Sequence, residues 1–255
     1  MTYYSTVAAD NPSNWWRLAD PGGIIAQDIG GATPHAPLYV PGAASSPYLG
    51  PSSDGAATAK AGTSASLYNI LNPIPLLNLW TIETWAWLFS RSANQGIMSL
   101  DQVGGGGGCA IRYNAAGTLI GFIVGSSVAT YATVTAPGAW HHFALTYDHV
   151  TLRLYLDGAQ VASVAVVVST SYSVSPRVGE EATGANLSTG FFADAAYYNA
   201  TLSAAQLLAH YNAADQRTST PLYLGGGTYD VTIGASGGIA TDLSNVYRAV
   251  HKTYV

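Results

Sequence analysis

The spacing of three glutamates decides whether this chain could hydrolyse a glycosidic bond. A retaining glycosidase places two carboxyl groups about 5–5.5 Å apart, and residues two apart on a strand share a face. Glu83 is followed by Thr84 and Trp85, so it has no acidic partner at that spacing. Glu180 and Glu181 are adjacent and would point to opposite faces of a strand. We therefore predict no enzymatic activity and no catalytic residues.

Three further features resemble chemical motifs, and each has a structural explanation. His141 and His142 are adjacent, so on a strand their rings diverge and cannot chelate one metal ion together. We expect one ring to pack inside and the other to be solvated. Cys109, the single cysteine, has no neighbouring histidine and cannot form an intrachain disulfide. The run Gly104–Gly108 lacks the Gly-Lys-Ser/Thr ending of a phosphate-binding loop.

Calcium is the remaining candidate ligand. It needs about six to eight oxygen atoms that converge on one point, and aspartates in loop-like sequence could supply some of them. Turn formation is the commoner role of such aspartates, so we predict no cofactor and keep calcium as the alternative. The aspartates concerned are Asp20, Asp28, Asp54 and Asp101.

The segments that carry these residues have mainly β-strand patterns. In residues 81–89, TIETWAWLF, the two alternating sets of side chains are both compatible with burial. Such a strand is covered on both faces, as expected of an inner strand of a sandwich. Asp157-Gly158 lies between two alternating runs and predicts a tight hairpin turn with positive φ at both positions. Short strands separated by Gly, Pro, Asn and Asp are typical of an antiparallel sandwich. Other expected strands are 118–125, 140–147, 152–156 and 160–168.

Two segments have helical patterns. In residues 203–213, Ser203 precedes Gln206 by three positions, which predicts a capping box. Near the C-terminus, Thr241 or Asp242 can cap a helix with an i, i+3, i+4, i+7, i+11 apolar stripe. We predict a sandwich domain over residues 1–215 and an arm over 216–255, made of a Gly-rich linker, a short strand and this amphipathic helix. The stripe that we expect to mediate assembly consists of Leu243, Val246, Tyr247, Val250 and Tyr254.

The aromatic residues divide into two expected groups. Six tryptophans and 17 tyrosines are present, and exposed ones could stack on sugar rings or anchor a protein interface. We expect most tryptophans to be core residues, namely Trp15, Trp16, Trp85, Trp87 and Trp140. The tyrosines expected at the surface are Tyr3, Tyr4, Tyr39, Tyr48, Tyr131 and Tyr172.

Composition excludes several classes of protein. The chain is 48% hydrophobic and only 9% charged, the reverse of a disordered chain. Its net charge is −5 and it has no Lys/Arg run, which argues against nucleic-acid binding. No apolar run approaches the ~20 residues that span a bilayer, so we expect no membrane partner. The N-terminus lacks the basic and apolar regions of a secretory signal, so we expect synthesis in the host cytoplasm.

Five blocks in order along the chain resemble the laminin-G-like, concanavalin A-like jelly-roll modules of bacterial and phage proteins. The resemblance implies an all-β fold of two antiparallel sheets packed face to face, with a short helix near residues 203–213. In related glucanases the catalytic carboxylates come from one strand with an E-x-D-x-x-E pattern, which this chain lacks. The blocks are residues 11–20, 81–85, 140–148, 152–158 and 196–211.

These observations predict a non-enzymatic structural or binding protein with a lectin-like fold. Low charge with many Ala, Gly, Ser and Thr residues suits a surface that packs closely against neighbours, and no disulfide is needed. We expect a bacteriophage virion component, either a capsid decoration or a tail-associated protein. Its partners would be other virion proteins and further copies of itself. The alternative is a carbohydrate-binding adhesion module that recognises cell-surface glycans.

Overall fold

The computed structural model describes most of the first 214 residues. These are residues 2–18, 28–30, 38–39, 43–49, 51, 56–60, 67–68, 73–90, 94–102, 107–123, 127–131, 137–181 and 186–214, with the backbone alone for 38–39, 43–49, 56–60 and 67–68. The expected arm 216–255 therefore lies outside the described residues. So do its stripe residues Leu243, Val246, Tyr247, Val250 and Tyr254, and the loop aspartates Asp20 and Asp54.

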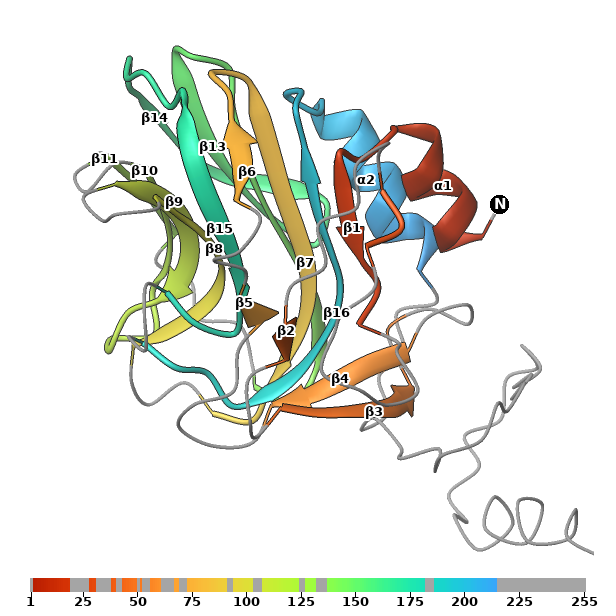
Figure 1. Ribbon diagram of the computed structural model, residues 1–255. Helices are drawn as coiled ribbons and strands as arrows, with labels where there is room; N and C mark the ends of the chain where they lie inside the picture. Colours follow the sequence, from red (N-terminus) through yellow and green to blue (C-terminus); the bar gives the residue numbers. More distant parts are fainter. Residues whose placement is uncertain are drawn as a thin grey trace, which may run out of the picture.

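Sheet A is one of two eight-stranded antiparallel sheets (Figure 1). Its strands follow the order β14-β13-β12-β7-β16-β4-β3, and β1 also pairs with β16. In that order the strands span Ala159–Ala165, Thr151–Leu156, Trp140–Tyr147, Trp80–Leu88, Gly190–Tyr198, Ala56–Lys60 and Ala43–Leu49, with β1 at Asn14–Trp16. Sheet A thus joins segments from both ends of the described chain.

Sheet B packs against sheet A and has the order β11-β10-β9-β8-β15-β5-β2, with β6 also paired to β15. In that order its strands span Ser127–Tyr131, Leu119–Ile123, Gly108–Tyr113, Gln95–Gln102, Tyr172–Val178, Leu67–Tyr68 and Leu38–Tyr39, with β6 at Ile74–Leu76. The predicted all-β, two-sheet antiparallel jelly-roll sandwich is therefore confirmed.

Alternation along the strands divides the core into two layers. On β7, Ile82, Ala86 and Leu88 enter the cluster between the sheets, whereas Trp85 and Trp87 enter a second cluster on the outer face of sheet A. Every residue of β7 is buried, so the strand is covered on both faces as its sequence predicts. The expected core tryptophans Trp15, Trp16, Trp85, Trp87 and Trp140 are all buried.

Two helices, α1 (Tyr3–Ala9) and α2 (Ala204–Ala213), lie side by side over the outer face of sheet A (Figure 1). The sequence analysis missed α1 and wrongly expected Tyr3 at the surface. Tyr3 and Val7 are four residues apart, so they share a helix face and both are buried. The Tyr3 ring makes an edge contact with Trp85. Within the described residues, no helix is long and apolar enough to cross a membrane.

Two local predictions are confirmed. Ser203 caps α2 and forms the full capping box with Gln206. Asp157 and Gly158 have φ values of 52° and 75° and form the turn between β13 and β14. The turn lies against α2, because a Cβ atom at Gly158 would come within 3.0 Å of the Leu208 Cα. Gly158 is needed there for both its backbone conformation and the close approach of the helix.

Candidate functional site

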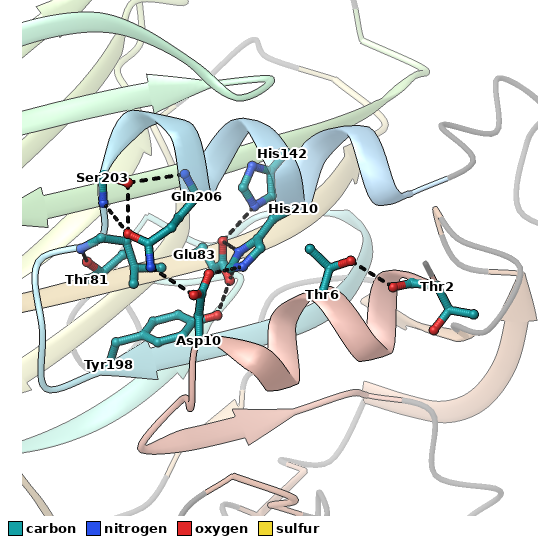
Figure 2. A network of polar contacts seen from close by, with 11 residues as sticks. Thr2, Thr6, Asp10, Thr81, Glu83, His142, Tyr198, Ser203, Gln206 and His210 are labelled. Atoms are coloured by element: carbon teal, nitrogen blue, oxygen red, sulfur yellow. Dashed lines mark hydrogen bonds and ion pairs between the residues drawn. The ribbon is translucent and has the colours of Figure 1, made fainter.

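Glu83, in the middle of β7, is the centre of a buried polar network between sheet A and the two helices (Figure 2). Its side chain is completely buried. The carboxylate accepts hydrogen bonds from the Tyr198 hydroxyl and from His142 Nε2 at 3.0 Å. His210 Nδ1 lies 3.0 Å from each carboxylate oxygen. Three elements, β12, β16 and α2, therefore supply the donors for this one acidic group.

His210 connects Glu83 to a second carboxylate. Its Nε2 atom lies 2.9 Å from Asp10 Oδ2, while its Nδ1 faces Glu83. A carboxylate oxygen faces each ring nitrogen, and this arrangement favours the imidazolium form, in which both nitrogens donate hydrogen bonds. Burial alone would lower the pKa of His210, but the charges of Glu83 and Asp10 and the hydrogen bonds to them raise it above its ordinary value.

The same contacts keep Glu83 ionised. Burial acts to raise the pKa of Glu83, but the charge of His210 and the hydrogen bonds from His142 and His210 outweigh it and hold this pKa well below its usual range. Burial and the neighbouring Glu83 charge raise the pKa of Tyr198 well above its ordinary value. The tyrosine therefore remains a hydrogen-bond donor. The network therefore consists of an ion pair between Glu83 and His210, with Tyr198 and His142 as further hydrogen-bond donors to the same carboxylate.

The network extends to the start of α2 and to the end of α1. Gln206 on α2 donates from Nε2 to Asp10 Oδ1 at 2.8 Å, and its Oε1 accepts from the backbone N–H of Ser203 at 2.9 Å. Asp10 is the residue that ends α1. Thr81 of β7 accepts a hydrogen bond from the backbone N–H of Leu202, just before α2. These contacts join the two helices to each other and the start of α2 to sheet A.

The chemistry available to Glu83 is limited by its surroundings. The side chains of Glu83, His142 and His210 are all completely buried, so no solute can reach the carboxylate. In the described part of the chain, no group of three or more His, Cys, Asp or Glu residues is arranged to hold a metal ion. The arrangement is suited to holding elements together.

The other carboxylates that the structure describes also accept hydrogen bonds or form ion pairs. Their partners are side chains on neighbouring strands, turns or helices, so these groups have structural contacts of their own. The pairs are Asp10 with Gln206, Asp28 with Asn14, Asp101 with Arg177, Asp148 with Arg153, Asp157 with His141, Glu180 with Arg177, Glu181 with Arg112, and Asp194 with Arg17.

Side chains that are adjacent in the sequence have different surroundings in the structure. His142 is buried beside Glu83, whereas the side chain of His141 is 20% exposed and its Nδ1 lies 2.8 Å from Asp157 Oδ2. The two rings diverge as predicted. Glu180 pairs with Arg177 and Glu181 with Arg112, so these adjacent glutamates have different partners.

The remaining candidates have structural surroundings. Cys109 is buried, and burial together with the charge of Asp101 raises the pKa of its thiol well above the ordinary value, so it stays protonated as expected of an inert thiol. Asp28 accepts hydrogen bonds from the backbone of Trp15 and Gly30 and so orders a local turn. Asp101 forms an ion pair with Arg177 at 2.5 Å. Asp28 and Asp101 therefore have separate partners within the fold.

Sequence reasoning missed the partners of Glu83. Asp10 and His210 are 200 residues apart, and no pattern in the chain joins them. One local signal was available: His210 lies three residues after Leu207, and both are buried on the same face of α2. A histidine on the apolar face of a helix indicates a buried polar partner, although it does not identify that partner.

The fold and the buried network define a lectin-like β-sandwich whose outer sheet face is closed by two helices. Residues 59–208 match the model of the concanavalin A-like lectin/glucanases superfamily, and the chain belongs to this family. The resemblance to laminin-G-like, concanavalin A-like jelly-roll modules is thereby confirmed. No curated protein sequence matches the chain significantly.

Solved structures that are similar to this chain are distant from it in sequence. The botulinum neurotoxin serotype D binding domain is 10% identical, with a TM-score of 0.61 over 81% of this chain and 52% of that one. Trypanosoma rangeli sialidase is also 10% identical, with a TM-score of 0.57 over 78% of this chain and 32% of that one. The chain thus spans about half of the neurotoxin domain and a third of the sialidase. A heptameric SAP-like pentraxin from Limulus polyphemus is 15% identical, with a TM-score of 0.48 over 58% of this chain and 76% of that one.

Proposed function

We propose that this chain is a non-enzymatic structural and binding module, and that it serves as a bacteriophage virion component. The observation that carries the non-enzymatic part is the use of carboxylates. Glu83 is buried under the helices, and the other described carboxylates have partners within the fold. A glycosidase needs two carboxylates placed to reach its substrate.

The first experiment tests the absence of catalysis. The purified full chain is incubated with a panel of plant, bacterial and animal polysaccharides, and newly released reducing ends are measured. We expect no release above that of a heat-denatured sample. Release by the native chain above that of the denatured sample would overturn the non-enzymatic proposal.

The virion role is supported by composition. A surface with few charges and many small side chains can approach neighbouring subunits without desolvating many ions. We propose that residues 216–255, with the stripe Leu243, Val246, Tyr247, Val250 and Tyr254, mediate this assembly. The test compares the full chain with a variant that lacks residues 218–255, by incorporation into purified phage particles. A truncated chain that is still incorporated would contradict the assembly role.

A glycan-binding adhesion module is the second candidate. It is favoured by the fold shared with the neurotoxin binding domain and by two exposed aromatic side chains, Tyr4 and Phe89, which are 45% and 50% exposed. Exposed aromatic rings can stack on sugars. A glycan array probed with the full chain tests the adhesion role. Binding that is lost in Tyr4→Ala or Phe89→Ala would support adhesion, and an array with no bound glycan would count against it.

A further inference from the structure

Four aliphatic side chains are exposed at one end of the sandwich. They belong to the three loops that connect β6 to β7, β12 to β13, and β14 to β15, at the top of Figure 1. Between 42% and 70% of the surface of each residue is exposed. Exposed apolar residues scattered singly are ordinary, whereas a group of them indicates an interaction surface. We call this surface the apolar end, and its residues are Leu77, Leu79, Val150 and Val167.

Hydrogen bonds hold the three loops of the apolar end together. Thr170, in the loop after β14, is buried; its backbone N–H donates to Asn78 Oδ1 at 3.0 Å and its hydroxyl donates to the Leu77 carbonyl. Earlier in the same loop, the Val166 N–H donates to the Val150 carbonyl at 2.8 Å. The surface is therefore formed before any partner binds, so little ordering entropy is lost on binding.

The composition and size of the apolar end indicate the kind of partner. Residues 73–82 and 166–176 include no Asp, Glu, Lys or Arg, and Asp148, near Val150, is paired with Arg153 at 2.7 Å. A standard interface between folded proteins buries about 800 Å² on each side, far more than four partly exposed side chains offer. The apolar end is therefore suited to a short apolar segment, such as one face of an amphipathic helix.

The C-terminal arm contains a segment of this kind. The stripe predicted from the sequence, from Leu243 to Tyr254, is uncharged, and Arg248 and Lys252 fall on the opposite face of the same predicted helix. Contact between the stripe and the apolar end would bury apolar groups on both sides without removing an ion from water. The stripe thus matches the apolar end in both size and polarity.

The direction of α2 favours a second copy as the acceptor of the stripe. Helix α2 begins near the apolar end, where the Leu202 N–H donates to Thr81. It runs toward the opposite end, where a Cβ atom at Gly158 would come within 3.0 Å of the Tyr211 Cβ. The arm therefore starts about one sandwich length, roughly 30 Å for a nine-residue strand, from its own apolar end. A Gly-rich linker of about 28 residues has an r.m.s. reach of about 30 Å, enough to reach a copy stacked against this exit.

We propose that the stripe of one copy of this chain docks on the apolar end of the next copy. The contact joins two different surfaces, so it is heterologous and can repeat from copy to copy until a ring closes. This inference rests on the proposed assembly role of residues 216–255, and it names the surface that receives them.

The first test places charges on the apolar end. Light scattering and sedimentation measure the mass of the full chain, of a Val150→Asp, Val167→Asp variant, and of a Ser90→Asp, Ala115→Asp control with two exposed positions at the opposite end. We expect the wild type and the control to form assemblies that grow with concentration. The Val150→Asp, Val167→Asp variant should have the mass of one chain and an unchanged circular dichroism spectrum. A wild type that stays monomeric, or a variant that assembles like the wild type, overturns the proposal.

The second test puts the two surfaces on different chains. One chain carries Val150→Asp and Val167→Asp and keeps its arm; the other lacks residues 218–255 and keeps its apolar end. Each should be monomeric alone, and an equimolar mixture should form a complex of two chains, which also shows that both are folded. A mixture that stays monomeric overturns the proposal.

The same variants separate this inference from the proposed role of the arm. If the chain that lacks residues 218–255 still assembles, both the docking contact and the assembly role of the arm are wrong. If that chain is monomeric while the Val150→Asp, Val167→Asp variant assembles, the arm mediates assembly through some other surface, and only the docking contact is wrong.

Discussion

At the scale of single residues, the contact between Glu83 and His210 is the one whose loss we expect to be costly. They lie 127 residues apart in the chain and both side chains are completely buried. A buried ion pair does not by itself add much stability, since desolvation of the two charges offsets their attraction. Its loss is nevertheless costly, because the remaining charge is then buried without a partner. The network therefore enforces the position of α2 on sheet A.

Substituting His210 tests this reasoning. His210→Ala leaves Glu83 and Asp10 without their shared cation, and we expect it to lower the free energy of unfolding by about 3–5 kcal/mol. Urea denaturation followed by tryptophan fluorescence measures the change. Arg153→Ala is the control, since its pair with Asp148 is about 30% exposed, and such surface pairs contribute about 0–1 kcal/mol. Equal effects of the two variants would contradict the role assigned to His210.

The same pair predicts how stability depends on pH. The pKa of His210 is raised in the folded state, so its contribution is complete below the unfolded value of about 6.5 and is lost as the pH rises through the folded pKa. The pKa of Glu83 is lowered, so its contribution is present above the unfolded value of about 4.3 and is lost as the pH falls toward the folded pKa. Stability should therefore be greatest between these two unfolded values.

Denaturation midpoints measured from pH 2 to pH 9 check this prediction on both sides. The groups that face the pair are His142 on β12, Tyr198 on β16 and Asp10 after α1, with Tyr3 of α1 also within electrostatic range of Glu83. A His210→Gln variant should be less stable at neutral pH and should lose the decline on the alkaline side. If the variant keeps the alkaline decline of the wild type, His210 is not its source.

At the scale of elements, the capping box holds the start of α2 against the network. The Ser203 hydroxyl accepts from the backbone N–H of Gln206, while Gln206 Oε1 accepts from the backbone N–H of Ser203. Replacing an N-cap serine by alanine costs about 1 kcal/mol, so Ser203→Ala should lower the unfolding free energy by about that amount. Ser90→Ala, an exposed serine outside any helix, should be neutral. A neutral Ser203→Ala would mean that tertiary contacts alone position α2.

Local patterns predicted the elements whose cause is local. Asp157-Gly158 specifies its turn through positive φ, and Ser203 with Gln206 specifies a helix start, so both were visible in the sequence. Helix α1 was not, because only Tyr3 and Val7 are buried in its seven residues. The short apolar pattern is too weak to indicate a helix. Packing against Trp85 and α2 stabilises it.

The candidate site was beyond sequence prediction for a different reason. The sequence offers only Trp85 as the same-face neighbour of Glu83 along its strand. The real partners, His142, Tyr198 and His210, come from an adjacent strand on either side and from a helix above them. Which of these side chains meet depends on strand order and register, which no local pattern specifies.

At the scale of the whole molecule, the sandwich has three layers and two cores. One cluster of buried residues lies between the sheets, and the other lies between sheet A and the helices. Helix α1 begins at residue 3 and α2 ends at residue 213, and the two contact each other. The third layer therefore joins the beginning of the chain to the end of the described part, with Asp10 and His210 as the polar link.

This arrangement predicts opposite results for two truncations. Both buried clusters lie within residues 3–214, so a chain that ends at residue 215 should fold with a melting temperature within a few degrees of the full chain. A chain that ends at residue 203 loses α2, exposes Trp85, and leaves Glu83 without His210. The free-energy cost of exposing that apolar surface, together with the loss of the contacts of α2, is large relative to the marginal net stability of a folded domain.

Calorimetry and proteolysis of the two truncated chains provide the measurement. We expect a single cooperative transition for the chain that ends at 215, and no transition with rapid cleavage for the chain that ends at 203. Loss of folding in the longer truncation would move the domain boundary beyond residue 215. A folded shorter truncation would show that the inter-sheet core is sufficient by itself, and the two helices would then be an attachment to the sandwich rather than part of its stability.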